Sequence, residues 1–287
     1  MTVKNKLSIA YLSRDEFPPQ RPDVKILFGQ EFQKLGHKVD WYLMARESIN
    51  KSYEIDYYSG KASVSKRHDK SKLSGRLSNL FIAFAKDFKF IFEKKFKYNI
   101  LLYKDRFVSA PLVFLACKLK GISCVYWLSY PYHLEYDAVA KESSGLKKIL
   151  LGIRSYLTKA MLEKLIIPLS DHVFVQSEGM KQLFTGDFPA EKFTAVPMGF
   201  DEASAIAIEP HKREQPTIVY LGTLSRIRKI DFIIEAFAKA KVEGLDAKLC
   251  LIGGGEVPGD EEIIKSLIKK LGISARKFRL NELCTLL

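Results

Sequence analysis

Three positively charged side chains gather in one short segment of the chain. They are Arg226, Arg228 and Lys229. The apolar run Ile218–Leu221 before them predicts a buried strand that Gly222 ends, and Asp231 after them is placed to cap a helix. Cations at the carboxyl end of a strand, in front of a helix amino terminus, favour an anion. We therefore expect the three cations, together with Gly222 and Thr223, to bind a diphosphate group.

A run of three glycines follows the next expected strand, Ala247–Ile252. These glycines are Gly253, Gly254 and Gly255. Glycine lets a ligand approach the backbone closely, but it also serves tight strand-to-helix connections that bind nothing. The glycine turn by itself is therefore weak evidence for a binding site.

The composition is that of a folded protein with room for two domains. The chain has 287 residues, of which 47% are hydrophobic and 12% aromatic. Its four cysteines are scattered without metal-ligand spacing, which is typical of reduced thiols in the cytoplasm, and we expect no metal site. The start of the chain turns polar at Ser13, too early for a signal peptide, and no apolar run approaches the roughly 20 residues that span a bilayer. We expect a cytoplasmic protein, either soluble or peripheral to a membrane.

The net charge of the chain is +13, which favours anionic partners. Much of the positive charge lies between Lys61 and Lys97, where a solvated basic face is the alternative to a binding surface. Nucleic acid is not an expected partner, because the chain carries no motif that recognises it.

Apolar strand-like and helix-like segments alternate along the chain. Strands are expected at Leu7–Leu12, Val39–Leu43, Ile100–Tyr103, Cys124–Leu128, Val173–Gln176 and Phe193–Val196. Helices are expected at Val24–Leu35, Leu73–Phe96, Ala110–Leu119, Leu146–Ile166 and Glu178–Phe184, whereas Arg46–Lys72 is expected to be rich in loops. The alternation predicts an α/β fold with parallel sheets. We expect an amino-terminal domain at 1–200, a linker at 201–216 and a carboxyl-terminal domain at 217–287.

Four segments agree in order and spacing with one known family. They are Ser170–Phe184, Phe193–Asp201, Ile218–Phe237 and Lys248–Gly255. Through them the chain resembles the family-four glycosyltransferases, which are retaining enzymes of GT-B architecture. The resemblance implies two Rossmann-like domains, the second incomplete here, with a nucleotide-sugar donor in the cleft. It also implies transfer of the sugar to an acceptor hydroxyl with retention of configuration, without a metal or other cofactor.

The resemblance assigns a role to the cationic loop and to the glycine turn. In the family the second domain holds the nucleotide diphosphate, so the three cations would neutralise the leaving group. The family usually has Gly-Arg after the strand, where this chain has Gly222-Thr223 with the arginine displaced to Arg226. The glycine turn, 253–255, would lie near the nucleotide base.

The resemblance also indicates two residues of the first domain. His133 lies in the segment Trp127–Ala138, expected to be a loop, and would be a catalytic residue near the donor sugar. A structural role is the usual one for a lone histidine in an aromatic segment. Arg106 follows the strand that ends at Tyr103 and would meet the acceptor or a phosphate. The segment Ser13–Arg21 stands where the family has a glycine-rich loop.

The segment 217–287 offers two strands where the family has a sheet of about six. We expect the family's Glu-x7-Glu segment, whose glutamates hold the donor sugar and ribose, to be absent: the pair with this spacing, Glu235 and Glu243, belongs to the helix that follows the cationic loop. We expect a truncated or frame-shifted form of a longer enzyme, with a complete smaller domain of other topology as the alternative. A non-catalytic nucleotide-binding fragment and a GT-B sugar-nucleotide epimerase are the alternative functions.

Two expected helices are apolar on one side and basic on the other. They are Leu73–Phe96 and Leu146–Ile166. Basic amphipathic helices can lie on anionic membranes, although core helices with a solvated basic face have the same pattern. Because the resemblance points to envelope, polysaccharide or glycolipid synthesis, we expect a lipid-linked acceptor and a place on the inner face of the plasma membrane.

Overall fold

The computed structural model describes residues 6–69, 72–92, 98–199, 216–224, 228–254 and 259–272. The chain divides into two compact units, Met1–Ile206 and Ala207–Leu287. Residues 201–215 of the expected linker lie outside the described residues.

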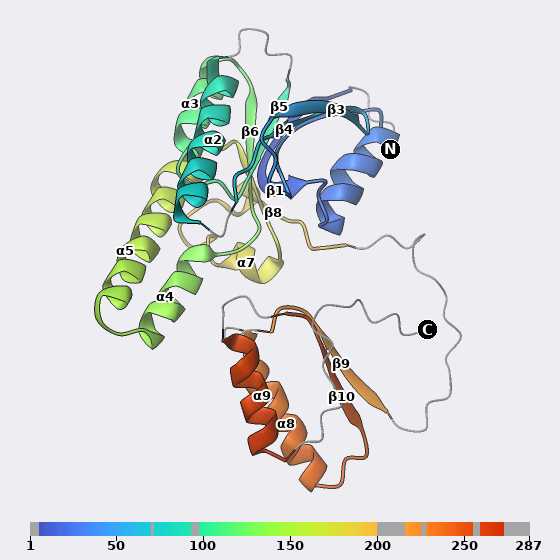
Figure 1. Ribbon diagram of the computed structural model, residues 1–287. Coiled ribbons are helices and arrows are strands. Elements are labelled where there is room, and N and C mark those ends of the chain that lie inside the picture. The colour runs from blue at the N-terminus through green and yellow to red at the C-terminus, as the bar shows by residue number, and fades with distance from the viewer. Residues whose placement is uncertain are drawn as a thin grey trace. The chain divides into compact units, whose positions relative to one another are not determined.

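An eight-stranded sheet forms the first unit (Figure 1). Its strands are β1 (Ser8–Phe17), β2 (Lys38–Ala45), β3 (Tyr53–Tyr57), β4 (Gly60–Ser65), β5 (Ile100–Lys104), β6 (Ser123–Leu128), β7 (His172–Val175) and β8 (Phe193–Ala195). The order in the sheet is β3-β4-β2-β1-β5-β6-β7-β8, and every neighbouring pair is parallel except β3 with β4. The chain thus builds outward from β1 to β2 on one side and from β5 to β8 on the other. The strand order reverses between β1 and β5.

Helices follow most of the parallel strands and lie on both faces of the sheet (Figure 1). They are η1 (Asp23–Glu31), α1 (Phe32–Lys34), α2 (Leu73–Phe92), α3 (Ala110–Leu119), α4 (Tyr132–Glu142), α5 (Gly145–Met161), η2 (Leu162–Ile166), α6 (Ile167–Leu169), α7 (Glu178–Gln182) and η3 (Ala190–Lys192). Within the described residues, none of the helices has both the length and the apolar character needed to cross a bilayer.

Each face of the sheet has its own hydrophobic core. Along β1, Tyr11 packs with Phe28 of η1 in one core, whereas Leu12 packs with Phe114 of α3 in the other. Successive side chains of a strand point to opposite faces, so a strand that is covered on both faces is apolar throughout. The sequence prediction of an α/β fold with parallel strands is confirmed.

Two predictions for the first unit are wrong. The segment Arg46–Lys72 contains the hairpin of β3 and β4, although β3 is an exposed edge strand with little burial. The alternation of apolar and polar residues in Tyr53–Tyr57 is a strand signal that the sequence prediction missed. The segment Trp127–Ala138 is not a loop but the end of β6 and the start of α4. Helix α4 escapes prediction because, of its described side chains, it buries only His133 and Ala140.

The second unit has two parallel strands, β9 (Thr217–Leu221) and β10 (Lys248–Ile252), and two helices, α8 (Ile230–Val242) and α9 (Asp260–Lys270). A small core that includes Ile234 and Leu251 joins them. The prediction that β9 is buried is wrong, since Leu221 is 77% exposed. With two strands in the described residues, β9 has one hydrogen-bonded neighbour, and several of its apolar side chains face solvent.

Replacement of Phe114 by alanine should destabilise the first unit strongly. The ring of Phe114 is fully buried, so its loss leaves a cavity and should lower the free energy of unfolding by about 4 kcal/mol. The matched control is Leu119→Ala on the same helix, where the side chain is 83% exposed, with an expected change within about 0.5 kcal/mol. Urea unfolding followed by circular dichroism measures both, and equal midpoints for the two variants would contradict the described core.

Candidate functional site

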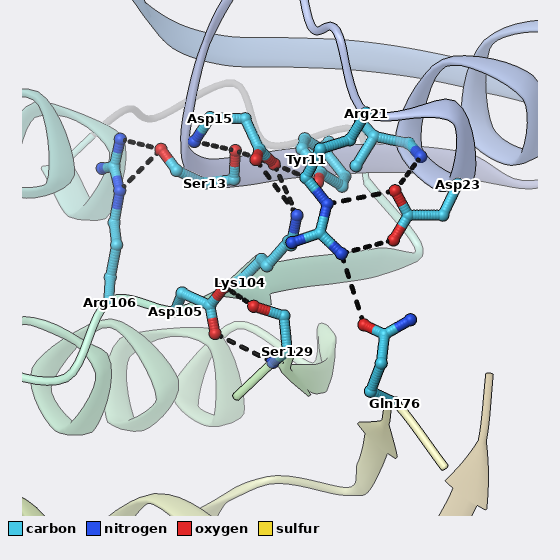
Figure 2. A network of polar contacts seen from close by, with 11 residues as sticks. Tyr11, Ser13, Asp15, Arg21, Asp23, Lys104, Asp105, Arg106, Ser129 and Gln176 are labelled. Carbon is cyan, nitrogen blue, oxygen red and sulfur yellow. Dashed lines mark hydrogen bonds and ion pairs between the residues drawn. The ribbon is translucent and has the colours of Figure 1, made fainter. Parts of the chain in front are cut away.

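Polar side chains gather at the carboxyl ends of four neighbouring strands, β1, β5, β6 and β7 (Figure 2). They are Ser13, Asp15, Lys104, Asp105, Arg106, Ser129 and Gln176. The pairing of β1 with β2 shifts register between Leu12 and Glu16, and such an irregularity re-aims the side chains between those positions. Open α/β sheets bind ligands outside the carboxyl ends of the strands, at the point where the strand order reverses. In this sheet the reversal lies between the neighbouring strands β1 and β5.

An ion pair joins the ends of β1 and β5. The Nζ atom of Lys104 lies 2.8 and 3.1 Å from the two carboxylate oxygens of Asp15, and its side chain is 1% exposed. The hydroxyls of Tyr11 and Ser13 donate to the same carboxylate at 2.8 and 2.9 Å. Burial acts to raise the pKa of Asp15, but the charge of Lys104 and these hydrogen bonds outweigh it, so the net pKa is below its ordinary value.

Arg106 is held by the protein itself. Its Nε and Nη2 atoms donate to the carbonyl oxygen of Ser13 at 2.9 and 2.5 Å, and Nη1 pairs with the buried carboxylate of Asp87. Asp87 also accepts hydrogen bonds at 2.7 Å from Tyr103 and at 2.6 Å from Ser109. Arg106 therefore fixes the end of β1 against β5 and α2, and its contact with acceptor or phosphate stays a prediction.

Asp105 is a residue of this site that sequence reasoning missed. Its backbone has φ 55°, in the left-handed region that aspartate tolerates better than most residues. This conformation turns the carboxylate toward β6, where it accepts from the backbone nitrogen of Ser129 at 2.9 Å and from the Ser129 hydroxyl. Burial raises the pKa of Asp105, and the bonds from Ser129 and the charge of Lys104 only partly oppose this. The signal in the sequence is the triplet Lys104–Asp105–Arg106, in which three charges end an apolar strand.

A third polar contact links η1 to β7 across the same edge (Figure 2). The guanidinium of Arg21 donates to both carboxylate oxygens of Asp23, at 3.1 and 2.6 Å, and to Oε1 of Gln176 at 3.3 Å. The segment Ser13–Arg21 therefore closes this edge with charged side chains, where a glycine-rich loop would present backbone.

His133 lies in the first turn of α4 rather than in a loop. It is 7% exposed, and its Nδ1 atom has no hydrogen-bond partner among the described residues. Burial and then the charge of Lys159 lower the pKa of His133, with Asp137 opposing them, so the ring is neutral at physiological pH. A neutral imidazole with an unpartnered nitrogen is able to exchange a proton, and its catalytic role stays a prediction.

In the second unit, the loop after β9 and the glycine turn after β10 lie side by side. The backbone nitrogen of Gly222 donates to Ile252 at 2.9 Å, and that of Leu224 donates to Gly254 at 2.9 Å. A Cβ atom on Gly253, which has φ 151°, would stand 1.8 Å from the carbonyl oxygen of Gly222. Glycine is therefore required there to let the two loops meet.

The amino terminus of α8 stands beside these loops with two exposed cations. They are Arg228 and Lys229. The prediction that Asp231 caps α8 is wrong: Lys229 occupies the cap position at φ 52°, without a side-chain cap, and Asp231 lies in the first helical turn. The structure thus brings Gly222 and Thr223 close to Gly253 and Gly254 at one end of the unit, whereas Arg226 and Gly255 lie outside the described residues. His133 and Arg106 belong to the other unit.

The comparisons with known proteins show the fold. No family model and no curated protein matches the chain. Among solved structures, the chain is similar to the lipopolysaccharide outer core galactosyltransferase WaaB in its apo form (17% identity, TM-score 0.56) and to sucrose-phosphate synthase from Thermosynechococcus elongatus (15%, 0.58). It is also similar to a trehalose-6-phosphate structure from E. coli bound with UDP-2-fluoro glucose (10%, 0.57). The chain has the GT-B fold.

These similarities extend over most of the chain but over less of the solved structures. The three matches cover 93%, 94% and 92% of this chain, and 66%, 69% and 69% of the solved chains. The chain therefore spans about two thirds of the length of the proteins that it matches. The two units correspond to the Rossmann-like domains expected from the sequence.

Removal of the charge on Lys104 should destabilise the first unit. The variant Lys104→Met leaves the carboxylate of Asp15 without its cation and should lower the free energy of unfolding by about 3 kcal/mol. The double variant Lys104→Met with Asp15→Asn should lose less, because no buried charge is left unpaired. Lys38→Met, which breaks the partly exposed pair with Asp40, is the control, with an expected loss below about 1 kcal/mol. Urea unfolding measures the loss of stability in each single variant and in the double variant. A loss in the double variant equal to the sum of the losses in Lys104→Met and Asp15→Asn would contradict an interaction between the two side chains.

Replacement of Asp105 should change how stability depends on pH. Because its folded-state pKa is raised, its protonated form favours folding, and this contribution is lost as the pH rises through that pKa. The free energy of unfolding of Asp105→Asn, relative to the unmodified protein, should therefore increase from about pH 4 to about pH 7. Asp187→Asn, at an exposed aspartate, is the control for which we expect a flat difference. A flat difference for Asp105→Asn as well would contradict the shifted pKa.

Proposed function

We propose that the protein is a glycosyltransferase, which moves a sugar from a nucleotide-sugar donor to an acceptor hydroxyl with retention of the anomeric configuration. The observation that carries the proposal is that the loop after β9 and the glycine turn after β10 meet through backbone hydrogen bonds, in the unit where exposed Arg228 and Lys229 precede α8. The leaving group of a sugar nucleotide is a diphosphate, whose charge suits backbone nitrogens, fixed cations and a helix amino terminus. One of the solved structures with this fold has UDP-2-fluoro glucose bound.

The cations of the second unit would act on the leaving group. The bond between the anomeric carbon and the diphosphate oxygen breaks, the acceptor oxygen bonds to the same carbon on the same face, and the acceptor hydroxyl gives its proton to the departing diphosphate. Arg228 can hold a phosphate with two donors, and Lys229 acts as a point charge. Arg226 is expected to join them. Charge that is stabilised as it develops lowers the barrier to departure.

The first unit would receive the acceptor at the carboxyl edge of its sheet. The Lys104–Asp15 pair and Asp105 provide charged and hydrogen-bonding groups there, and neutral His133 is proposed to lie near the donor sugar. The acceptor class that we propose is a lipid-linked intermediate of polysaccharide or glycolipid synthesis, at the inner face of the plasma membrane. The sugar nucleotide is a substrate, and the proposal includes no cofactor.

Neutralisation of the cations at the start of α8 should weaken nucleotide binding. The variant Arg228→Gln with Lys229→Gln should lower the affinity for a nucleoside diphosphate about tenfold or more, because it removes two charge-assisted contacts. Lys239→Gln with Lys241→Gln, at the other end of the same helix, is the control and should leave affinity unchanged. Calorimetry with uridine, guanosine and adenosine diphosphates, each tested separately, measures the effect.

Two results would contradict this proposal. Unchanged affinity in the Arg228 and Lys229 variant would remove the diphosphate site from α8. The second result is binding of a nucleoside diphosphate without release of sugar from the corresponding uridine, guanosine or adenosine diphosphate hexose. This result would indicate a nucleotide-binding protein instead of an enzyme.

A further inference from the structure

Helix α5 packs on its neighbour with one side only. The hydroxyl of Ser155 donates to the backbone oxygen of His133 on α4 at 2.8 Å, and the guanidinium of Arg154 lies 4.2 Å from the ring centroid of Tyr136. These contacts define the side of α5 that faces α4. None of the residues of α5 is buried. The sequence alternative of a core helix is therefore wrong for α5.

The opposite side of α5 carries an exposed apolar stripe. The stripe consists of Leu146, Ile149, Leu150, Ile153 and Leu157, which are 70%, 59%, 57%, 52% and 53% exposed. Their spacing places them along one face of the helix. Single exposed apolar residues are normal on a protein surface, whereas a continuous row of them marks an interaction site.

Cations accompany the apolar stripe. By helical spacing Lys147 and Arg154 lie beside the stripe, whereas Lys148 and Lys159 lie on the side of Ser155. Residues 145–161 contain no acidic side chain. Helix α2, the other amphipathic candidate, differs because it buries Asp87 and Phe90 in the first unit. A second copy of the chain is a poor partner for α5, since two identical basic helices would repel each other. An anionic lipid surface offers both an apolar layer for the stripe and negative headgroups for the cations.

We propose that α5 is the membrane-contacting element of the protein, with its apolar stripe among the acyl chains of an anionic leaflet and Lys147, which lies beside the stripe, at the headgroups. In this position α5 lies parallel to the membrane plane. The inference does not depend on sugar transfer, and lipid binding is measured without any substrate.

Vesicle co-sedimentation tests the proposal with the full chain. The unmodified protein should sediment with phosphatidylcholine vesicles that contain phosphatidylglycerol, but not with phosphatidylcholine alone, and high salt should weaken the binding. The variant Ile149→Gln, Ile153→Gln, Leu157→Gln should reduce the bound fraction about tenfold at equal lipid concentration, and glutamine preserves helix propensity.

A control variant tests whether vesicle binding depends on the apolar residues of α5 or on the loss of any three exposed apolar residues. Leu35→Gln, Ile55→Gln and Leu183→Gln changes three residues outside α5 that are 50%, 47% and 52% exposed, and it should bind vesicles as the unmodified protein does. Unchanged circular dichroism confirms that each variant is folded. Equal binding of the two triple variants would overturn the proposal. So would the absence of binding to anionic vesicles, or self-association by sedimentation velocity that the α5 variant abolishes.

Discussion

The parallel direction of the strands is the constraint on which the rest of the structure depends. It brings the ends of β1 and β5 together, although the paired residues Leu12 and Tyr103 lie 91 positions apart in the sequence. Charged groups that meet in this way must neutralise one another, because an unpaired buried charge is costly. The Lys104–Asp15 pair does so, and Arg106 ties the carbonyl of Ser13 to Asp87. The charged groups at this edge of the first unit are therefore held in place by other groups of the protein itself.

In the second unit the strand ends are joined by backbone contacts instead of side-chain ion pairs. Gly253 approaches Gly222 so closely that no side chain fits between them, and the backbone nitrogens of Gly222 and Leu224 donate to the carbonyl oxygens of Ile252 and Gly254. Exposed Arg228 and Lys229 stand at the amino terminus of α8, where we propose that the diphosphate binds. The charged edge of the first unit is where we propose that the acceptor binds.

The sequence predicts the strongly apolar parts of the fold and fails where burial is weak. Strands such as β1 and β6 are recognisable because both of their faces are covered, whereas β3 is exposed and α4 buries few of its side chains. The sequence indicates a cationic loop after β9, and its binding of a diphosphate stays a prediction. Asp105 could not be identified as a site residue from the sequence, because its raised pKa arises from burial and its orientation from a left-handed backbone. The apolar stripe of α5 was visible, but only the structure separates it from a core helix.

The central claim is that the two loops at the strand ends of the second unit hold a nucleotide diphosphate. Backbone amide chemical shifts, recorded while a nucleoside diphosphate is added, test it most directly. The account predicts that the largest shifts occur at Gly222, Thr223, Lys229, Gly253 and Gly254, while the amides at the far ends of β9 and α8 change little. Shifts that are absent from these five amides when uridine, guanosine and adenosine diphosphates are each added to saturation would contradict it.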